Sequence, residues 1–290
     1  MSKSRAVMLL IATAATWGAT FPVVKAALAD CGPLTFLALR FGAAGVLVLP
    51  LVGSGWGHRG ERRAALCGVA LFAGYTLQTW GLATTTPARS AFITALAVVL
   101  VPLVEPAVGI ARPGAPVWLG ALLTCVGLAI LLRPEARPLT LGDLLTVGCA
   151  LAFAAHVLLL QWTVRVIAPA RASAIQVVVT AAIAVPVAGI ERWRFVPTAR
   201  LGAAIVLCAV LATVFAFWAM TAVQQVLSAS VTAIVLAFEP VAAAVVSVAL
   251  GQDPLTLSLL GGGGLVVAGV VLATARPGAR VTATFPPAAD

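Results

Sequence analysis

Long runs of residues without Asp, Glu, Lys or Arg are the feature that most limits how this chain can fold. A helix needs about 20 apolar residues to cross a bilayer core of about 30 Å. Seven charge-free runs have that length, and an eighth, 201–238, fits two crossings with a turn at Gln224-Gln225. The seven are 6–24, 41–58, 64–88, 113–132, 144–164, 172–190 and 254–275. The short alternating segments of a membrane barrel are absent from the sequence.

Composition excludes a water-soluble protein. Hydrophobic residues make up 62% of the 290 residues and charged residues only 9%, and the mean hydropathy is +1.11. Soluble domains carry about 25% charged residues. The net charge of +9 comes from Lys and Arg in short connections, where they meet lipid headgroups, so we predict no nucleic-acid partner.

We therefore predict an all-α integral membrane protein with ten transmembrane helices. If the N-terminus is cytoplasmic, ten basic residues fall in inside segments and six in outside loops, which favours an N-in, C-in, multi-pass protein of a bacterial-type inner cell membrane. The tail 276–290 is predicted to be disordered and cytoplasmic. The ten helices are expected at 5–28, 33–52, 64–84, 88–110, 115–133, 142–163, 172–190, 201–222, 227–250 and 256–275.

A weak internal repeat relates the two halves of the chain, 5–133 and 142–275. A shift of 138 residues places Trp80 on Trp218 and Pro102 on Pro240. With five spans in each half, the second half enters the membrane from the opposite side. Inverted repeats are typical of transporters that work by alternating access, with the substrate site between the repeats.

The sequence resembles the EamA-type proteins of the drug/metabolite transporter superfamily. The resemblance rests on Trp17-Gly18-Ala19-Thr20-Phe21 with Lys25, on Leu39-Arg40-Phe41 after Pro33, and on Glu239-Pro240-Val241. It implies two inverted repeats of five helices and the export or exchange of amino acids or other metabolites. The Gly-Glu pair that this family often has after helices four and nine is missing, because those regions read Ile110-Ala111-Arg112 and Gly251-Gln252-Asp253.

Two basic residues lie within the first two predicted spans. Lys25 is near the end of helix one, and Arg40 lies about 10 Å along helix two. They form a positive patch for a substrate carboxylate in one interpretation. In the other, they are structural and pair with Asp30 or with loop carbonyls.

Ionisable groups inside a membrane are costly and mark candidate sites. Glu105 and Glu239 each precede a proline, where a helix can kink. We expect Glu105, near the end of helix four, to reach water, and Glu239 to face a central cavity. His156 lies in mid-helix six, either as a proton relay or as a hydrogen-bonded structural residue.

Trp17 lies in mid-helix one and is expected to line the cavity, where its ring can stack on a substrate. Tyr75, Gln78 and Thr94 are expected to offer hydrogen bonds there, and Thr20 completes the candidate set.

These features predict a secondary transporter that exports small metabolites, such as amino acids or related amphipathic compounds. A proton is the candidate coupling ion, and the sequence leaves the oligomeric state open. A membrane structural subunit and an intramembrane enzyme are the alternatives; the sequence has no P-loop and no H-E-x-x-H motif. The five scattered cysteines have no metal-site spacing, so we predict no disulfide, metal or cofactor.

Overall fold

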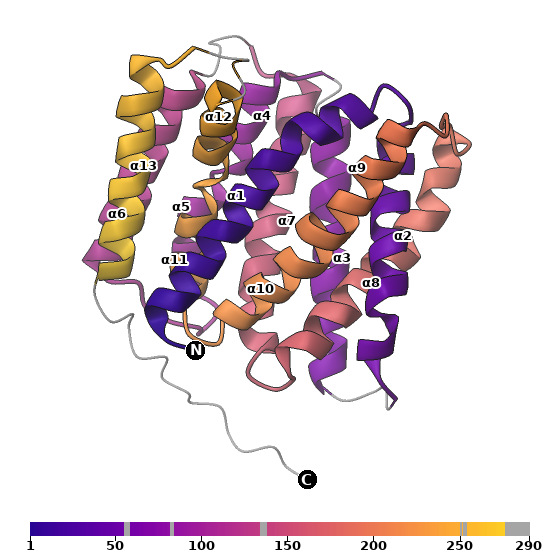
Figure 1. Cartoon of the computed structure of the whole chain (residues 1–290). Helices are drawn as coiled ribbons and strands as arrows, with labels where there is room; N and C mark the ends of the chain where they lie inside the picture. The colour runs from indigo at the N-terminus through magenta and orange to yellow at the C-terminus, as the bar shows by residue number, and fades with distance from the viewer. Residues whose placement is uncertain (55–58, 82–83, 134–137, 250, 252–253, 276–290) are drawn as a thin grey trace.

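The protein is described by a computed structural model of the whole chain, in which residues 1–54, 59–81, 84–133, 138–249, 251 and 254–275 are placed (Figure 1). The placed residues are helical, apart from turns, connections and one isolated bridge between Cys31 and Phe195. The all-α prediction is therefore confirmed. The predicted tail 276–290 lies outside the described residues.

The helices follow the charge-free runs of the sequence. In chain order they are α1 (Lys3–Ala27), α2 (Pro33–Val52), α3 (Arg59–Gly81), α4 (Pro87–Thr94), α5 (Ala97–Val104), α6 (Ala115–Leu132), α7 (Leu141–Thr163), α8 (Pro169–Val187), η1 (Ala188–Glu191), α9 (Ala199–Ala209), η2 (Val210–Phe215), α10 (Ala216–Val223), α11 (Ala229–Leu236), α12 (Glu239–Ala249) and α13 (Leu257–Ala275). The η2 segment has π-helical hydrogen bonding and runs continuously from α9 into α10. The chain turns at residues 224–226, so the predicted turn at Gln224-Gln225 is confirmed.

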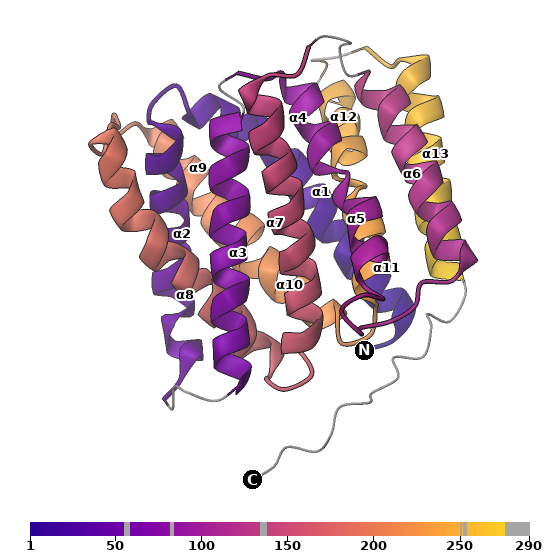
Figure 2. The ribbon, with the colours of Figure 1, turned by 180° about the vertical axis from the view of Figure 1, so that it is seen from behind.

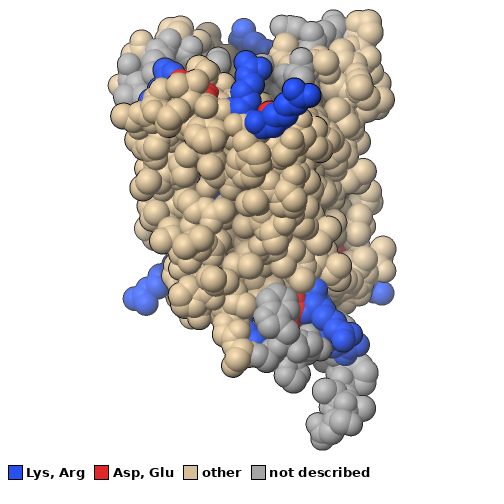
Figure 3. Space-filling view, turned by 90° about the vertical axis from the view of Figure 1, so that its right-hand side faces the viewer, with Lys and Arg blue, Asp and Glu red and all other residues tan. Residues whose placement is uncertain are grey.

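The surface of the molecule is that of a membrane protein. Charged side chains gather at the two ends, and a broad uncharged band separates them (Figure 3). Among the described residues, seven helices are long and apolar enough to cross a membrane. They are Pro33–Val52, Ala115–Leu132, Leu141–Thr163, Pro169–Glu191, Ala199–Val223, Ala229–Ala249 and Leu257–Ala275. The N-terminus and the last residues of α13 lie at the same end of the molecule, called the N-terminal end below (Figure 1).

Two of the predicted spans are broken near their middle. The predicted helix 88–110 is two helices, α4 and α5, and ends at Val104. The predicted helix 227–250 is divided into α11 and α12. Pro240 explains the second break, because it has no N–H to donate to the carbonyl of Leu236, the last residue of α11. In the first turn of α12 the same missing N–H costs little.

The helices form a single bundle with two paired edges. Helices α6 and α13 lie together at one edge, and α2 and α8 lie at the other (Figures 1 and 2). Glycines set the close approach of α6 and α13: a Cβ added at Gly127 would lie 2.6 Å from the carbonyl oxygen of Gly262, and one added at Gly262 would lie 2.6 Å from that of Gly127. Such contacts are typical of close helix packing in membranes.

Helix limits in the two halves correspond at a shift slightly larger than the one in the sequence. The N-caps Thr86 and Ser228 are 142 residues apart. Helix α6 begins at Ala115 and α13 begins at Leu257, which is again 142 residues later. The 138-residue shift that aligns Trp80 with Trp218 therefore does not extend to these helices.

Candidate functional site

Arg40 is buried near the middle of α2 and is held by the π-helical segment η2. Its Nε donates to Thr213 Oγ1 at 2.7 Å, and its Nη2 donates to the carbonyl of Ala212 at 2.8 Å. The Thr213 hydroxyl in turn donates to the carbonyl of Cys208, five residues earlier. A π-segment loosens the regular backbone ladder and is frequent at functional sites, which explains how a carbonyl inside a span can serve another helix.

The structural alternative for Arg40, pairing with Asp30 or with loop carbonyls, is wrong. Asp30 accepts hydrogen bonds from Arg200 and Thr198 instead. The carbonyl that Arg40 does use belongs to a helix. Because the hydrogen-bond partners of Arg40 are neutral groups, its positive charge stays available within the bundle.

Aromatic rings surround this guanidinium. Its Cζ lies 5.4 Å from the ring centre of Phe41 and 5.2 Å from that of Tyr75, which are cation–π distances. The Tyr75 hydroxyl is 3.5 Å from Nη2. Trp17 approaches from α1, and its Nε1 donates to the same Ala212 carbonyl at 2.8 Å. Phe217 contacts both Trp17 and Phe41.

Glu239 is the acidic member of this group. It is the first residue of α12, directly after the helix break, and it is half-buried. It lies near enough to interact electrostatically with Arg40 and Tyr75. Its backbone is fixed against α1, because a Cβ added at Gly18 would lie 2.6 Å from the Glu239 carbonyl oxygen. We call Trp17, Arg40, Tyr75 and Glu239 the central cluster.

The other predicted residues are less closely joined to the central cluster. Thr20 is buried and bonds to the carbonyl of Trp17 within its own helix. Gln78 is half-buried on α3, and Thr94, the last residue of α4, has its hydroxyl 3.8 Å from the sulfur of Cys149. The side chain of Lys25 lies outside the described residues.

His156 is buried in a chain of hydrogen bonds. Its Nε2 is 2.7 Å from Gln176 Oε1, and Gln176 Nε2 donates to Thr221 Oγ1 at 3.1 Å. Its ring also contacts Phe217 edge-on, and only 2% of the residue is exposed. Sequence reasoning had named neither Gln176 nor Thr213, although both are polar residues inside charge-free runs.

The expectation that Glu105 reaches water is wrong. Glu105 follows α5 directly and is 0% exposed. Its Oε2 accepts a short hydrogen bond from the hydroxyl of Ser230 in α11. Position near the end of a helix suggested exposure, but α11, which is distant in sequence, covers this carboxylate.

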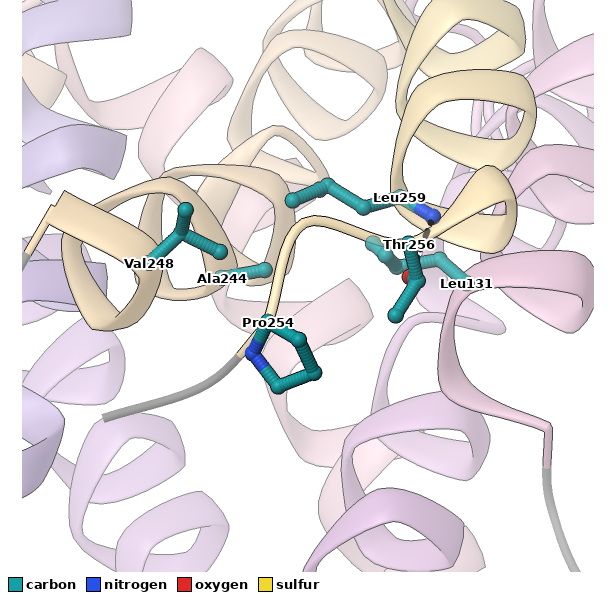
Figure 4. A pocket seen from close by; sticks show the side chains of 6 residues that line it. All are labelled: Leu131, Ala244, Val248, Pro254, Thr256 and Leu259. Carbon is teal, nitrogen blue, oxygen red and sulfur yellow. Dashed lines mark hydrogen bonds between the residues drawn. The ribbon is translucent and has the colours of Figure 1, made fainter. Parts of the chain in front are cut away.

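Two small cavities lie away from the central cluster. One of about 190 Å³ is lined by Leu131, Ala244, Val248, Pro254, Thr256 and Leu259, mostly apolar side chains (Figure 4). The other, of about 250 Å³, lies between the outer ends of α6 and α13. Neither contains a charged side chain to orient a ligand, so the central cluster is the better candidate site.

Comparison with known proteins fits this arrangement. The model of the EamA-like transporter family matches residues 4–133 and again residues 140–275. This chain belongs to the EamA-like transporter family. A curated relative from Archaeoglobus fulgidus, described as an uncharacterized transporter, is 30% identical over 283 residues, which cover 92% of this chain and 85% of the relative.

A solved crystal structure, described only as that of a protein, has the same fold. Its TM-score to this EamA-like transporter is 0.81 at 18% identity, over 94% of this chain and 98% of the other. The family, the relative and the apolar helices together identify a multi-pass membrane transporter. The predicted family is therefore confirmed.

Proposed function

We propose that this protein is a secondary transporter that exports small amphipathic metabolites of the amino-acid type by alternating access. The observation that carries the proposal is the central cluster. A buried Arg40 with neutral hydrogen-bond partners lies within electrostatic reach of a half-buried Glu239, among aromatic rings. Such an arrangement complements a ligand that carries a negative group, a positive group and an apolar body.

Each part of the cluster has a role in this proposal. Arg40 binds the substrate carboxylate through its guanidinium, which the π-segment holds in a fixed orientation. Glu239 binds the substrate amine, or carries a proton as the coupling ion when no amine is present. Trp17 and Tyr75, both half-buried, contact the apolar part of the substrate. We place Thr20, Gln78, Thr94, Lys25 and His156 in the outer lining of the path.

Alternating access requires two similar halves that exchange roles. The family model matches the chain twice, and the caps and last helices of the halves recur at a shift of 142 residues. These findings support two inverted repeats, 5–133 and 142–275, with five crossings each once α4 with α5 and α11 with α12 are counted as broken spans. We further propose an N-in, C-in orientation in a bacterial-type inner membrane.

Transport by the purified protein in liposomes tests this proposal. Labelled amino acids should exchange across the liposome membrane faster than in protein-free liposomes. Matched analogues that lack either the carboxylate or the amine should exchange poorly, because each loses one charged partner. An imposed proton gradient should drive accumulation if Glu239 carries the coupling proton. Equal exchange of all three compound classes would contradict the roles given to Arg40 and Glu239.

A further inference from the structure

The turn between α10 and α11 is fastened by α7. Gln224 in this turn is buried, and its Nε2 donates to the carbonyl of Val157 at 3.1 Å. In return, Gln161 Nε2 donates to the carbonyl of Gln224 at 2.8 Å. Two amide side chains thus join the turn and α7 reciprocally.

Glu105 fastens the start of α11 from the α5 side. Beyond the hydroxyl of Ser230, the backbone N–H groups of Ala229 and Ser230 lie within its reach, so the carboxylate meets the positive N-terminal end of α11. Arg165, in the connection after α7, is near enough to interact with Glu105 electrostatically. The other carboxylate oxygen, Oε1, is buried and has no hydrogen-bond partner.

These contacts join the bundle at its N-terminal end. There α11 packs against α5 and α7 (Figures 1 and 2). Towards the other end, α4 and α12 share at most a marginal contact within the described residues. The buried Asp143 at that end binds Arg89 and Thr85, but α4 already packs against α7 there, so this pair joins neighbouring helices.

We infer that Glu105–Ser230 and Gln161–Gln224 form a polar gate that closes the N-terminal end of the transport path. The inference rests on the proposed function, because a transporter must open and close that end in each cycle. A polar gate suits this task. Its groups bond to each other when closed and to water when open, and the unpartnered Oε1 of Glu105 gains hydrogen bonds on opening. The two states therefore differ little in free energy, as a reversible switch requires.

The distance across the gate can be measured with spin labels at the exposed Ala107 and Gln225, with Cys125→Ser removing the half-buried native thiol. In Glu105→Gln, an amide N–H₂ group would face the N–H donors of α11. Loss of a hydrogen bond to a charged group should raise the ratio of long to short distances by roughly tenfold or more. Ser230→Ala should shift the ratio in the same direction and tests the gate if Glu105→Gln folds poorly.

Glu61→Gln is a matched control. Glu61 is also a buried carboxylate with one unpartnered oxygen, but it pairs with Arg171 at 3.2 Å and does not contact the 224–230 segment. The distance should stay as in the unmodified protein. An unchanged distance in both Glu105→Gln and Ser230→Ala, or an equal shift in Glu61→Gln, would overturn the gate. The measurement needs no substrate, so it can fail or succeed independently of the transport assay.

Discussion

Glu105 and Glu239 stand in the same local sequence, each directly before a proline near a broken helix, yet the fold gives them opposite surroundings. Glu105 is fully covered and bonded to the start of α11. Glu239 is half-buried at the start of α12 and within reach of Arg40 and Tyr75. One carboxylate joins two helices, and the other remains open to a ligand.

The difference follows from what each proline does to its helix. Pro240 lies in the first turn of α12, so Glu239 begins a helix at the break and projects beside α1 and α2. Pro106 follows α5, where the chain leaves the span and Glu105 meets the end of another helix. An acid before a proline therefore identifies a break, but the covering helix decides whether it is structural or functional.

The largest effect is expected from removing the structural carboxylate. Glu105→Ala leaves Ser230 and the first N–H groups of α11 buried without their acceptor, which should lower the free energy of unfolding by about 3 kcal/mol. Reaction of the buried cysteines with a thiol dye during heating measures this loss. Glu239→Ala should change stability by less than about 1 kcal/mol. Equal losses in the two variants would remove the distinction between them.

Transport should separate the two acids in the other direction. Glu239→Gln keeps the size of the side chain and loses the charge that faces the substrate amine. We expect insertion at normal levels and a fall in transport of about 10- to 100-fold, from the loss of a charged hydrogen-bond partner. Glu239→Asp, which keeps the charge, should retain more activity. Wild-type rates in Glu239→Gln across pH 5–8 would leave Glu239 a packing role.

Sequence reasoning succeeded where the information was local. Charge-free runs located the spans, and the segments around Trp17, Arg40 and Glu239 indicated the family and three members of the central cluster. It failed where the partner is distant in the chain. Nothing near Glu105 shows that α11 covers it, and nothing near Arg40 shows that a π-segment 172 residues later supplies its acceptor.

The orientation of Arg40 provides a finer test of the functional acid's surroundings. Thr213→Val keeps the shape of the side chain but removes the acceptor for Arg40 Nε. Arg40 then keeps its charge and loses its fixed position, so apparent substrate affinity should fall about fivefold, as for one hydrogen bond. Thr221→Val, in the next helix segment and bonded to Gln176, is the control and should change affinity less. Equal changes in both variants would mean that Thr213 acts only through helix packing.

The smallest effect is expected from an acid outside the spans. Asp30 accepts hydrogen bonds from Arg200 and Thr198, and the bond from Arg200 lowers the pKa of Asp30 from its usual 3.8. A lowered folded-state pKa means that the pair stabilises the protein above the unfolded-state pKa and loses its effect as pH falls through the folded value. Asp30→Asn should therefore melt slightly below wild type at about pH 7 and match it at about pH 3. The effect is small because the Arg200 side chain is 55% exposed and screened by solvent, and added salt should reduce it further. A melting difference that persists at low pH would show that Asp30 acts through its shape rather than its charge, unlike either Glu105 or Glu239.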